Sequence, residues 1–205
     1  MKIHGYSEFD IFANPAVVQN NVRVLYNGYA IFTEGNTDFK YLLVNGAVLE
    51  TNTGSGGNTT VRCFHTDTFQ FDDILHALND ATPIPSASVG TVAVDCPSKH
   101  LFKTSFSGAK FAICASGKLG FTAYSSDMTI AVEYLNGPIN ISMPLSDNTK
   151  ACADMATSVL MTPTGATLLT GISSYSHSRK LKAEGHMAME ASSCGVSPRL
   201  ALTSF

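Results

Sequence analysis

The chain has 205 residues, of which 44% are hydrophobic and only 14% are charged, and its formal net charge is −3. Intrinsic disorder goes with low hydrophobicity and high net charge, so this composition indicates a folded chain. The 13 Lys and Arg residues form no basic surface of the kind that binds nucleic acid, and we expect no nucleic-acid partner.

The N-terminal residues contain no apolar stretch of the kind found in signal peptides. No window approaches the ~18 consecutive apolar residues that a membrane-spanning helix needs. We therefore expect synthesis in the cytoplasm without a signal peptide, and no membrane partner.

Three Asn-Gly dipeptides stand inside apolar runs rich in β-branched and aromatic residues: Asn27-Gly28, Asn45-Gly46 and Asn136-Gly137. A type I′ turn needs positive φ at both central residues, which Asn tolerates and Gly adopts at no steric cost. Each dipeptide therefore predicts a β-hairpin. Pro138 removes a backbone N–H from the third turn, so we expect that turn to be open or to lie at a sheet edge.

The first predicted hairpin places Tyr26 opposite Tyr29, and these two rings are our candidate surface-binding aromatics. The second predicted hairpin is apolar on both faces near its turn. Because a half-exposed hairpin would alternate cleanly, a second sheet, a helix or another subunit must cover it. Its four leucine and valine residues are our candidate subunit contacts: Leu42, Leu43, Val48 and Leu49.

Helical spacing of apolar residues predicts one helix at about 71–81, ended by Pro83 and Pro85, and a second at about 148–160, ended by Pro163. Short strands separated by Ser/Gly turns are predicted between the helices, at 91–95, 101–106, 110–115 and 120–124. This rhythm is typical of sandwiches and barrels. We therefore expect a mainly β fold, an antiparallel β-sandwich or barrel built from hairpins with one or two short helices. Residues 1–175 should form a single β-rich domain with an inserted helix, and 176–205 a C-terminal arm or irregular extension.

The five cysteines are widely spaced and include no CxxC pair: Cys63, Cys96, Cys114, Cys152 and Cys194. This pattern favours reduced thiols that act as small core residues, rather than a disulfide framework or a zinc site. None of the histidines forms a pair with ligand spacing. We expect no metal and no cofactor.

Three functional hypotheses remain. The first is a structural, self-assembling β protein that is not an enzyme, a homo-oligomer within a virus or bacteriophage particle as a capsid, decoration, connector or tail subunit. Its partners would be copies of itself or other particle subunits, and it would be located in the virion. The second is a β-sandwich module that binds a glycan or a cell surface. The third is an enzyme that uses Cys63 and His65, which would share one face of a strand. No other catalytic motif is present.

Overall fold

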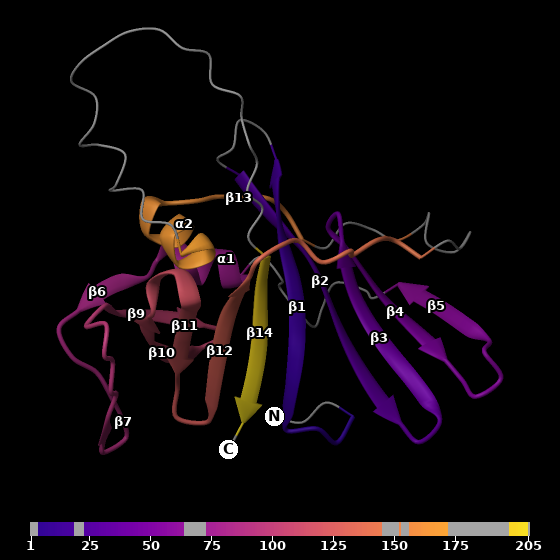
Figure 1. The fold of residues 1–205 in the computed structure, drawn as a ribbon, viewed down its shortest axis with the longest axis horizontal. Helices are drawn as coiled ribbons and strands as arrows, with labels where there is room; N and C mark the ends of the chain where they lie inside the picture. The colour runs from indigo at the N-terminus through magenta and orange to yellow at the C-terminus, as the bar shows by residue number, and fades with distance from the viewer. Residues whose placement is uncertain are drawn as a thin grey trace, which may run out of the picture.

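The computed structural model describes residues 4–18, 23–63, 73–144, 152, 156–171 and 197–204, the last of these stretches by its backbone. Twelve strands form one sheet with the order β5-β4-β3-β2-β1-β14-β12-β11-β10-β9-β6, and β13 pairs with β2 beside this path (Figure 1). The predicted mainly β, antiparallel class with short helices is confirmed. No pairing among the described strands joins β5 to β6, so the sheet is open and fits the sandwich alternative rather than the barrel.

The sheet has two halves. The N-terminal half-sheet consists of consecutive strands: β1 (Glu8–Val18), β2 (Arg23–Glu34), β3 (Thr37–Val44), β4 (Ala47–Thr53) and β5 (Thr59–Cys63). The second half-sheet consists of β6 (Thr82–Ile84), β9 (Leu101–Phe106), β10 (Ala109–Ala115), β11 (Gly120–Tyr124) and β12 (Met128–Leu135). Strand β14 (Ser197–Ser204) lies between β1 and β12 and joins the halves.

The remaining elements are short. Strands β7 (Ser88–Val89) and β8 (Val92–Ala93) form a separate two-stranded sheet, and β13 (Val159–Leu160) pairs with the first residues of β2. The helices are α1 (Asp73–Asn79), the 3-10 turn η1 (Gly117–Leu119) and α2 (Pro163–Thr170). None of the helices in the described ranges has the length and apolar character needed to cross a membrane.

The strands of the second half-sheet agree closely with the sequence prediction. Strands β9, β10 and β11 coincide with the predicted runs to within one residue at each end. The β9–β10 turn is the Ser107-Gly108 dipeptide, and both residues have positive φ. Ser/Gly turns therefore separate short strands in the second half-sheet, as predicted.

Of the three predicted Asn-Gly hairpins, only one forms. Asn45 and Gly46 have φ values of 52° and 92° and join β3 to β4, as predicted. Asn27-Gly28 lies in the middle of β2, which continues to Glu34. Asn136-Gly137 ends β12, and residues 138–144 form no strand.

Asn27 and Gly28 make contacts with neighbouring strands instead of forming a turn. A Cβ atom on Gly28 would lie 3.2 Å from the carbonyl oxygen of Phe12, so glycine allows β1 to approach β2 closely. The Asn27 side chain accepts a hydrogen bond of 2.8 Å from the backbone N–H of Asn45. The first dipeptide therefore supports the turn made by the second.

The first predicted helix is confirmed as α1 over Asp73–Asn79, but the second prediction, 148–160, is wrong in its described part. Residues 156–158 are irregular and Val159–Leu160 form β13. Pro163 begins α2 instead of ending a helix, because a first-turn proline lacks only an N–H that would have no helical partner. The Oγ1 atom of Thr162 caps α2 by accepting a hydrogen bond of 3.1 Å from Gly165.

Helices α1 and α2 cover the core of the second half-sheet (Figure 1). Leu75 of α1, Ile113 of β10 and Leu168 of α2 are each at most 2% exposed. The Asn79 side chain joins the two helices: it donates to the carbonyl of Leu160 and accepts from the N–H of Thr162, both at 2.8 Å.

The N-terminal half-sheet is covered by an extended stretch that contains no described helix. We call residues 138–144, 152 and 156–160 the cover segment; its two longer runs cross the upper ends of β1–β4 in Figure 1. Ile139 and the Asn14 side chain exchange two hydrogen bonds. The N–H of Ala156 donates to the carbonyl of Gly46 at 3.0 Å. The segment therefore wraps around the tip of the β3–β4 hairpin.

The predicted C-terminal extension is partly regular structure. Strand β14 pairs with both β1 and β12, so residues 197–204 belong to the sheet rather than to an irregular extension. Residues 172–196 lie outside the described residues, and the boundary at 175 stays a prediction.

Candidate assembly surfaces

The four candidate subunit contacts are buried inside the chain, which corrects their assignment. Leu42 and Leu49 pack beneath Ile141, Met143 and Cys152 of the cover segment. On the opposite face, Leu43 and Val48 pack against Ala156 of the same segment. The predicted cover over both faces of this hairpin exists, but the protein supplies it from its own chain.

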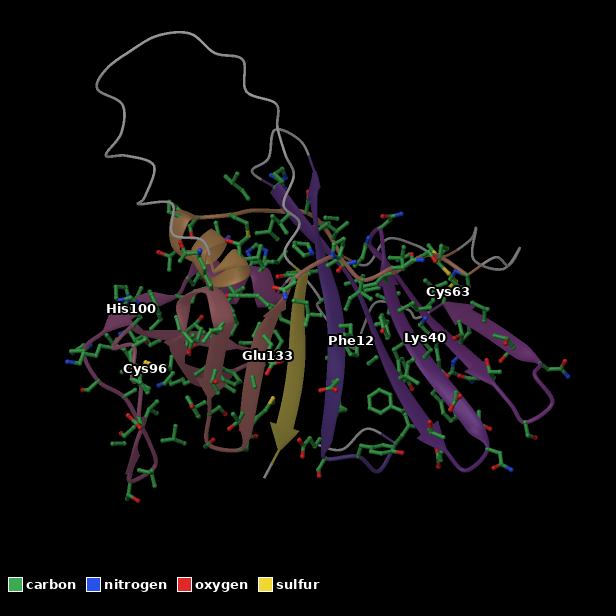
Figure 2. All side chains as sticks on the ribbon, viewed as in Figure 1. Phe12, Lys40, Cys63, Cys96, His100 and Glu133 are labelled. Carbon is green, nitrogen blue, oxygen red and sulfur yellow. A yellow bond between two sulfur atoms is a disulfide. The ribbon has the colours of Figure 1, made fainter. Side chains whose placement is uncertain are left out.

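The two candidate surface aromatics have different environments. Tyr26 packs against the core of the second half-sheet, and burial raises the pKa of its phenol far above the ordinary value. It is therefore partly buried against that core and is not an exposed surface-binding ring. Tyr29 is half-buried, stacks on Phe12 with ring centroids 5.1 Å apart, and has the Lys40 ammonium 4.8 Å from its ring centre. Phe12 and Lys40 come from the strands on either side of β2 (Figure 2).

Four cysteines form disulfides, so the prediction of reduced thiols is wrong for them. Cys63 at the end of β5 is bonded to Cys152 of the cover segment, and Cys96 is bonded to Cys114 of β10. Cys194 lies outside the described residues. The bonded cysteines are 89 and 18 positions apart in the sequence and are brought together by the order of the strands. Such pairs form no local sequence motif by which they could be recognised.

The Cys63–Cys152 bond also removes the thiol that the enzymatic hypothesis needs, because a thiolate is the nucleophile in cysteine catalysis. His65, the other residue of that pair, lies outside the described residues. Among the residues that are described, no three His, Cys, Asp or Glu side chains are grouped so that they could hold a metal ion.

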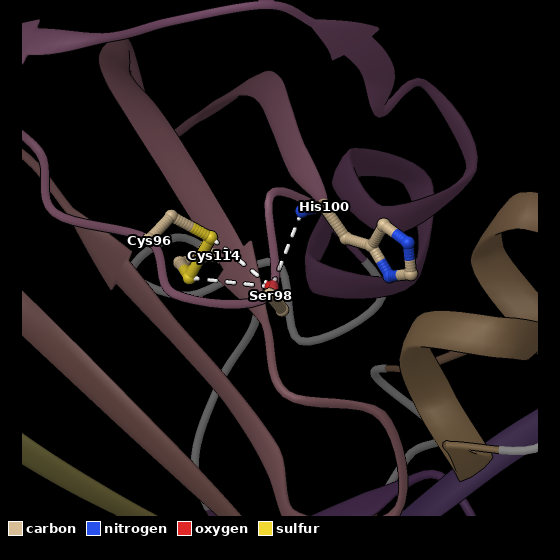
Figure 3. The surroundings of a disulfide bond; sticks show 4 residues. All are labelled: Cys96, Ser98, His100 and Cys114. Carbon is tan, nitrogen blue, oxygen red and sulfur yellow. Dashed lines mark hydrogen bonds between the residues drawn. A yellow bond between two sulfur atoms is a disulfide. The ribbon is translucent and has the colours of Figure 1, made fainter.

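The second disulfide fixes a turn against β10. The Ser98 hydroxyl lies 3.2 Å from the Cys96 sulfur and 3.8 Å from the Cys114 sulfur, and it accepts a hydrogen bond from the N–H of His100. The imidazole of His100 points away from the sulfur atoms (Figure 3). The group is therefore a structural anchor for the chain between β8 and β9.

A polar cluster holds the N-terminal turn on β2 and β3. The His4 ring lies 3.1 Å from a Glu34 carboxylate oxygen and 2.6 Å from the Tyr41 hydroxyl, and it stacks on Phe39 with centroids 4.3 Å apart. Both ring nitrogens thus have partners within the protein. This geometry suits a fixed turn rather than a histidine that exchanges protons with a substrate.

Glu50 is the most deeply buried charged residue in the described ranges, at 1% exposure. One carboxylate oxygen accepts from Arg62 at 2.6 Å, and the other oxygen has no hydrogen-bond partner. The Glu50 charge also raises the pKa of Tyr41, although burial of the phenol is the larger cause. The Glu50–Arg62 pair lies on the face of β3–β5 that is opposite the Leu42–Leu49 cluster.

A cleft opens where β1 and β2 separate. Their register begins at the Phe12–Tyr29 pair; Glu8–Phe12 are in register with β14, and Ile31–Glu34 with β3. The cavity between them measures about 360 Å³. We call this the β1–β2 cleft; its lining is aromatic with two acids, and consists of Tyr6, Glu8, Phe9, Asp10, Phe12, Tyr29, Ile31, Phe32 and Thr33. Ile31 is 52% exposed at its mouth.

A hairpin arm lies at the other end of the sheet. Strands β7 and β8 pair with each other around Gly90, whose φ is +59°, and they are separate from the main sheet (Figure 1). Val92 is 71% exposed. We call residues 85–96 the β7–β8 arm, and the Cys96–Cys114 bond holds its base to β10. A groove beside the arm is lined by Lys103 and Lys110.

The cleft and the arm carry opposite charges. Residues 4–12 and 29–41, which flank the cleft, contain four acids and one base, a net charge of −3; these are Glu8, Asp10, Glu34, Asp38 and Lys40. Residues 82–118, which contain the arm and its groove, carry four lysines and one acid, a net charge of +3; these are Lys99, Lys103, Lys110, Lys118 and Asp95.

Sequence reasoning found neither surface. The cleft forms because β1 stops pairing with β2 after the Phe12–Tyr29 pair. The predicted hairpin at Asn27-Gly28 would end the strand before that point, so it gave no indication of a cleft. The arm was predicted as an ordinary strand at 91–95; the adjacent Pro83, Pro85 and Pro97 were a signal that this chain leaves the sheet.

Comparison with known proteins gives no match: no family model, no curated protein and no solved structure is similar to this chain.

Proposed function

We propose that this protein is a structural, self-assembling β protein, a subunit of a virus or bacteriophage particle such as a capsid, decoration, connector or tail component. The observation that carries the proposal is the β7–β8 arm. It is a hairpin outside the main sheet, it exposes Val92, and a disulfide fixes its base. A paired hairpin outside the main sheet leaves the outer edges of its two strands open, and open strand edges can pair with another subunit.

Two further observations support a role in an assembled particle. Disulfides persist in oxidising surroundings, among which are virion surfaces, and the described residues contain two. The surface is also poor in charge, because only 14% of all residues are charged against about 25% in typical globular domains. Low surface charge reduces the electrostatic cost of packing many copies together.

The experiment that tests this function is a measurement of mass in solution. Light scattering and native mass spectrometry on the oxidised protein should show rings or polymers whose mass rises with protein concentration. Electron microscopy of the same samples should show a regular object. A protein that stays monomeric at every concentration would contradict the proposal.

Glycan binding is a second candidate, favoured by the lining of the β1–β2 cleft. Tyr6, Phe12 and Tyr29 offer aromatic faces there, and Glu8 and Asp10 offer acceptors for hydroxyl groups. Tyr26 takes no part, because it packs against the core and does not line the cleft. Glycan-array binding that is lost in Tyr29→Ala and retained in Tyr124→Ala, a half-buried tyrosine outside the cleft, would favour this candidate. Equal binding by both variants would exclude the cleft.

A further inference from the structure

We propose that the β7–β8 arm of one copy docks in the β1–β2 cleft of a neighbouring copy. This inference rests on the proposed function and names the contact through which it would operate. The contact joins two different surfaces of the same protein. Repeated from copy to copy, such a heterologous contact builds a ring or a helical filament rather than a symmetric dimer.

The cleft fits an extended chain. Its two walls are strands that separate after the Phe12–Tyr29 pair, and no described strand lies between them. Each wall is held from its outer side, β1 by β14 and β2 by β3, so the walls are preformed. The Phe9 and Phe32 rings meet across the cleft with centroids 5.2 Å apart and form its floor, so an incoming strand would lie over this floor and place alternate side chains on it.

The arm has the matching form. Its two strands are already paired, and a further hydrogen bond of 2.9 Å from the N–H of Val94 to the carbonyl of Ala87 extends the pairing. Little conformational entropy is therefore lost when the arm binds. Val92 is small enough for a cavity of about 360 Å³ whose floor contains Phe9 and Phe32.

Charge complementarity selects this partner. The acids Glu8 and Asp10 line the cleft, whereas Lys103 and Lys110 line the groove beside the arm. Docking the arm brings these groups of opposite sign together, which raises the association rate and disfavours docking of a cleft against a cleft.

The arm cannot reach the cleft of its own chain. Five strand spacings separate β1 from β9, which at about 4.8 Å each is about 24 Å. The Cys96–Cys114 bond ties the base of the arm to β10, which is four spacings, about 19 Å, from β1. The occupant must therefore be the arm of a second copy.

Two blocking variants test the contact. Val92→Asp places a negative charge on the arm where it would meet an acidic cleft, and Ile31→Asp places a further negative charge in the mouth of the cleft, so the two substitutions repel each other. Each variant alone should require at least about tenfold higher protein concentration to assemble, since one unfavourable buried charge exceeds 1.4 kcal/mol. Mixed in equal amounts, they retain one intact arm and one intact cleft, and they should form a heterodimer that does not grow.

The control is Leu119→Asp, which changes a leucine that is 77% exposed on η1, outside both surfaces, and should assemble like the unaltered protein. Circular dichroism should show that all variants are folded. The exposed pair Lys103→Glu and Glu8→Lys provides a second, milder test: each variant alone should assemble less readily, whereas their mixture should recover assembly because the exchanged charges attract each other.

The outcomes separate the two proposals. If the unaltered protein assembles and either blocking variant assembles equally well, the arm–cleft contact is wrong while the structural function stands. A mixture of the two blocking variants at Val92 and Ile31 that grows into large assemblies would also overturn the contact. If the unaltered protein remains monomeric, the structural function itself fails.

Discussion

The two halves of the sheet bury similar apolar residues by different means. The second half-sheet is covered by α1 and α2, and Leu75 and Leu168 provide its apolar contacts. The N-terminal half-sheet is covered by an extended segment, which is held by the Cys63–Cys152 bond and by hydrogen bonds to Asn14 and Gly46. A regular helix carries its own backbone hydrogen bonds, whereas an extended cover must find partners elsewhere. The difference predicts that the two covers fail under different perturbations.

The largest expected effect is loss of the Cys63–Cys152 bond. The double variant Cys63→Ser/Cys152→Ser should lower the free energy of unfolding by about 4.5 kcal/mol, because the bond closes a long loop in the unfolded chain. The Cys96→Ser/Cys114→Ser variant, whose cysteines are separated by 18 positions in the sequence, should lose about 3 kcal/mol. Urea unfolding followed by circular dichroism measures both.

The same pair of variants locates the effect. Hydrogen exchange in β3 and β4 should accelerate in the first variant, since the cover segment is no longer anchored over them, and β9–β11 should be less affected. Equal losses of stability, or a larger loss for the Cys96 pair, would contradict the view that the extended cover depends on its disulfide.

A smaller effect is expected from truncation of the apolar side chains in the two covers. Leu168→Ala in α2 should cost about 3 kcal/mol, because this leucine is almost fully buried. Ile141→Ala in the cover segment should cost about 1 kcal/mol, because Ile141 is only partly buried against Leu42 and Leu49. Thermal and urea unfolding of the oxidised proteins would compare them. A cost for Ile141→Ala as large as that for Leu168→Ala would show that packing, not anchoring, holds the extended cover.

The smallest effect concerns the contact between the halves, where Tyr26 of β2 reaches the core of the second half-sheet. Burial raises the pKa of Tyr26 and of Tyr134 above the ordinary value of 10.0. Above that pH the unfolded chain loses the phenol protons while the folded chain keeps them. Stability is therefore complete below pH 10 and falls as the pH rises above it, by about 0.8 kcal/mol per buried tyrosine at about pH 10.5.

Tyr26→Phe should remove about half of this alkaline loss, measured as the change in urea midpoint between neutral and alkaline pH. An unchanged alkaline slope in the variant would mean that Tyr26 ionises as easily in the folded protein as in the unfolded chain.

The sequence was most informative where structure is local. Strands β9–β11 and helix α1 follow from alternation, turn residues and helical spacing, and the Asn45-Gly46 turn follows from its φ requirement. The same rule failed at Asn27-Gly28, where a neighbouring strand, β1, needs the missing side chain. Pro163 was read as a stop although it also fits the first turn of a helix.

The candidate surfaces depended on long-range information. The apolar faces of the β3–β4 hairpin correctly predicted a cover, but nothing local distinguishes a neighbouring subunit from the chain's own cover segment. Cys63 meets Cys152 only because the fold brings Cys152 to the end of β5, and the arm and cleft exist only because of where strands leave the sheet.

The position of β14 has a consequence for the order of folding. Ribosomes make chains from the N-terminus, so β14 is the last described strand to emerge, although it occupies the middle of the sheet. Until it arrives, β1 and β12 both present open edges, and no described strand pairing joins the two half-sheets. Pairings between β1 and β14 span almost the whole sequence, and contacts of that separation form slowly. A nascent chain therefore passes through a stage with two open sheet edges, at which association with other copies competes with completion of the fold.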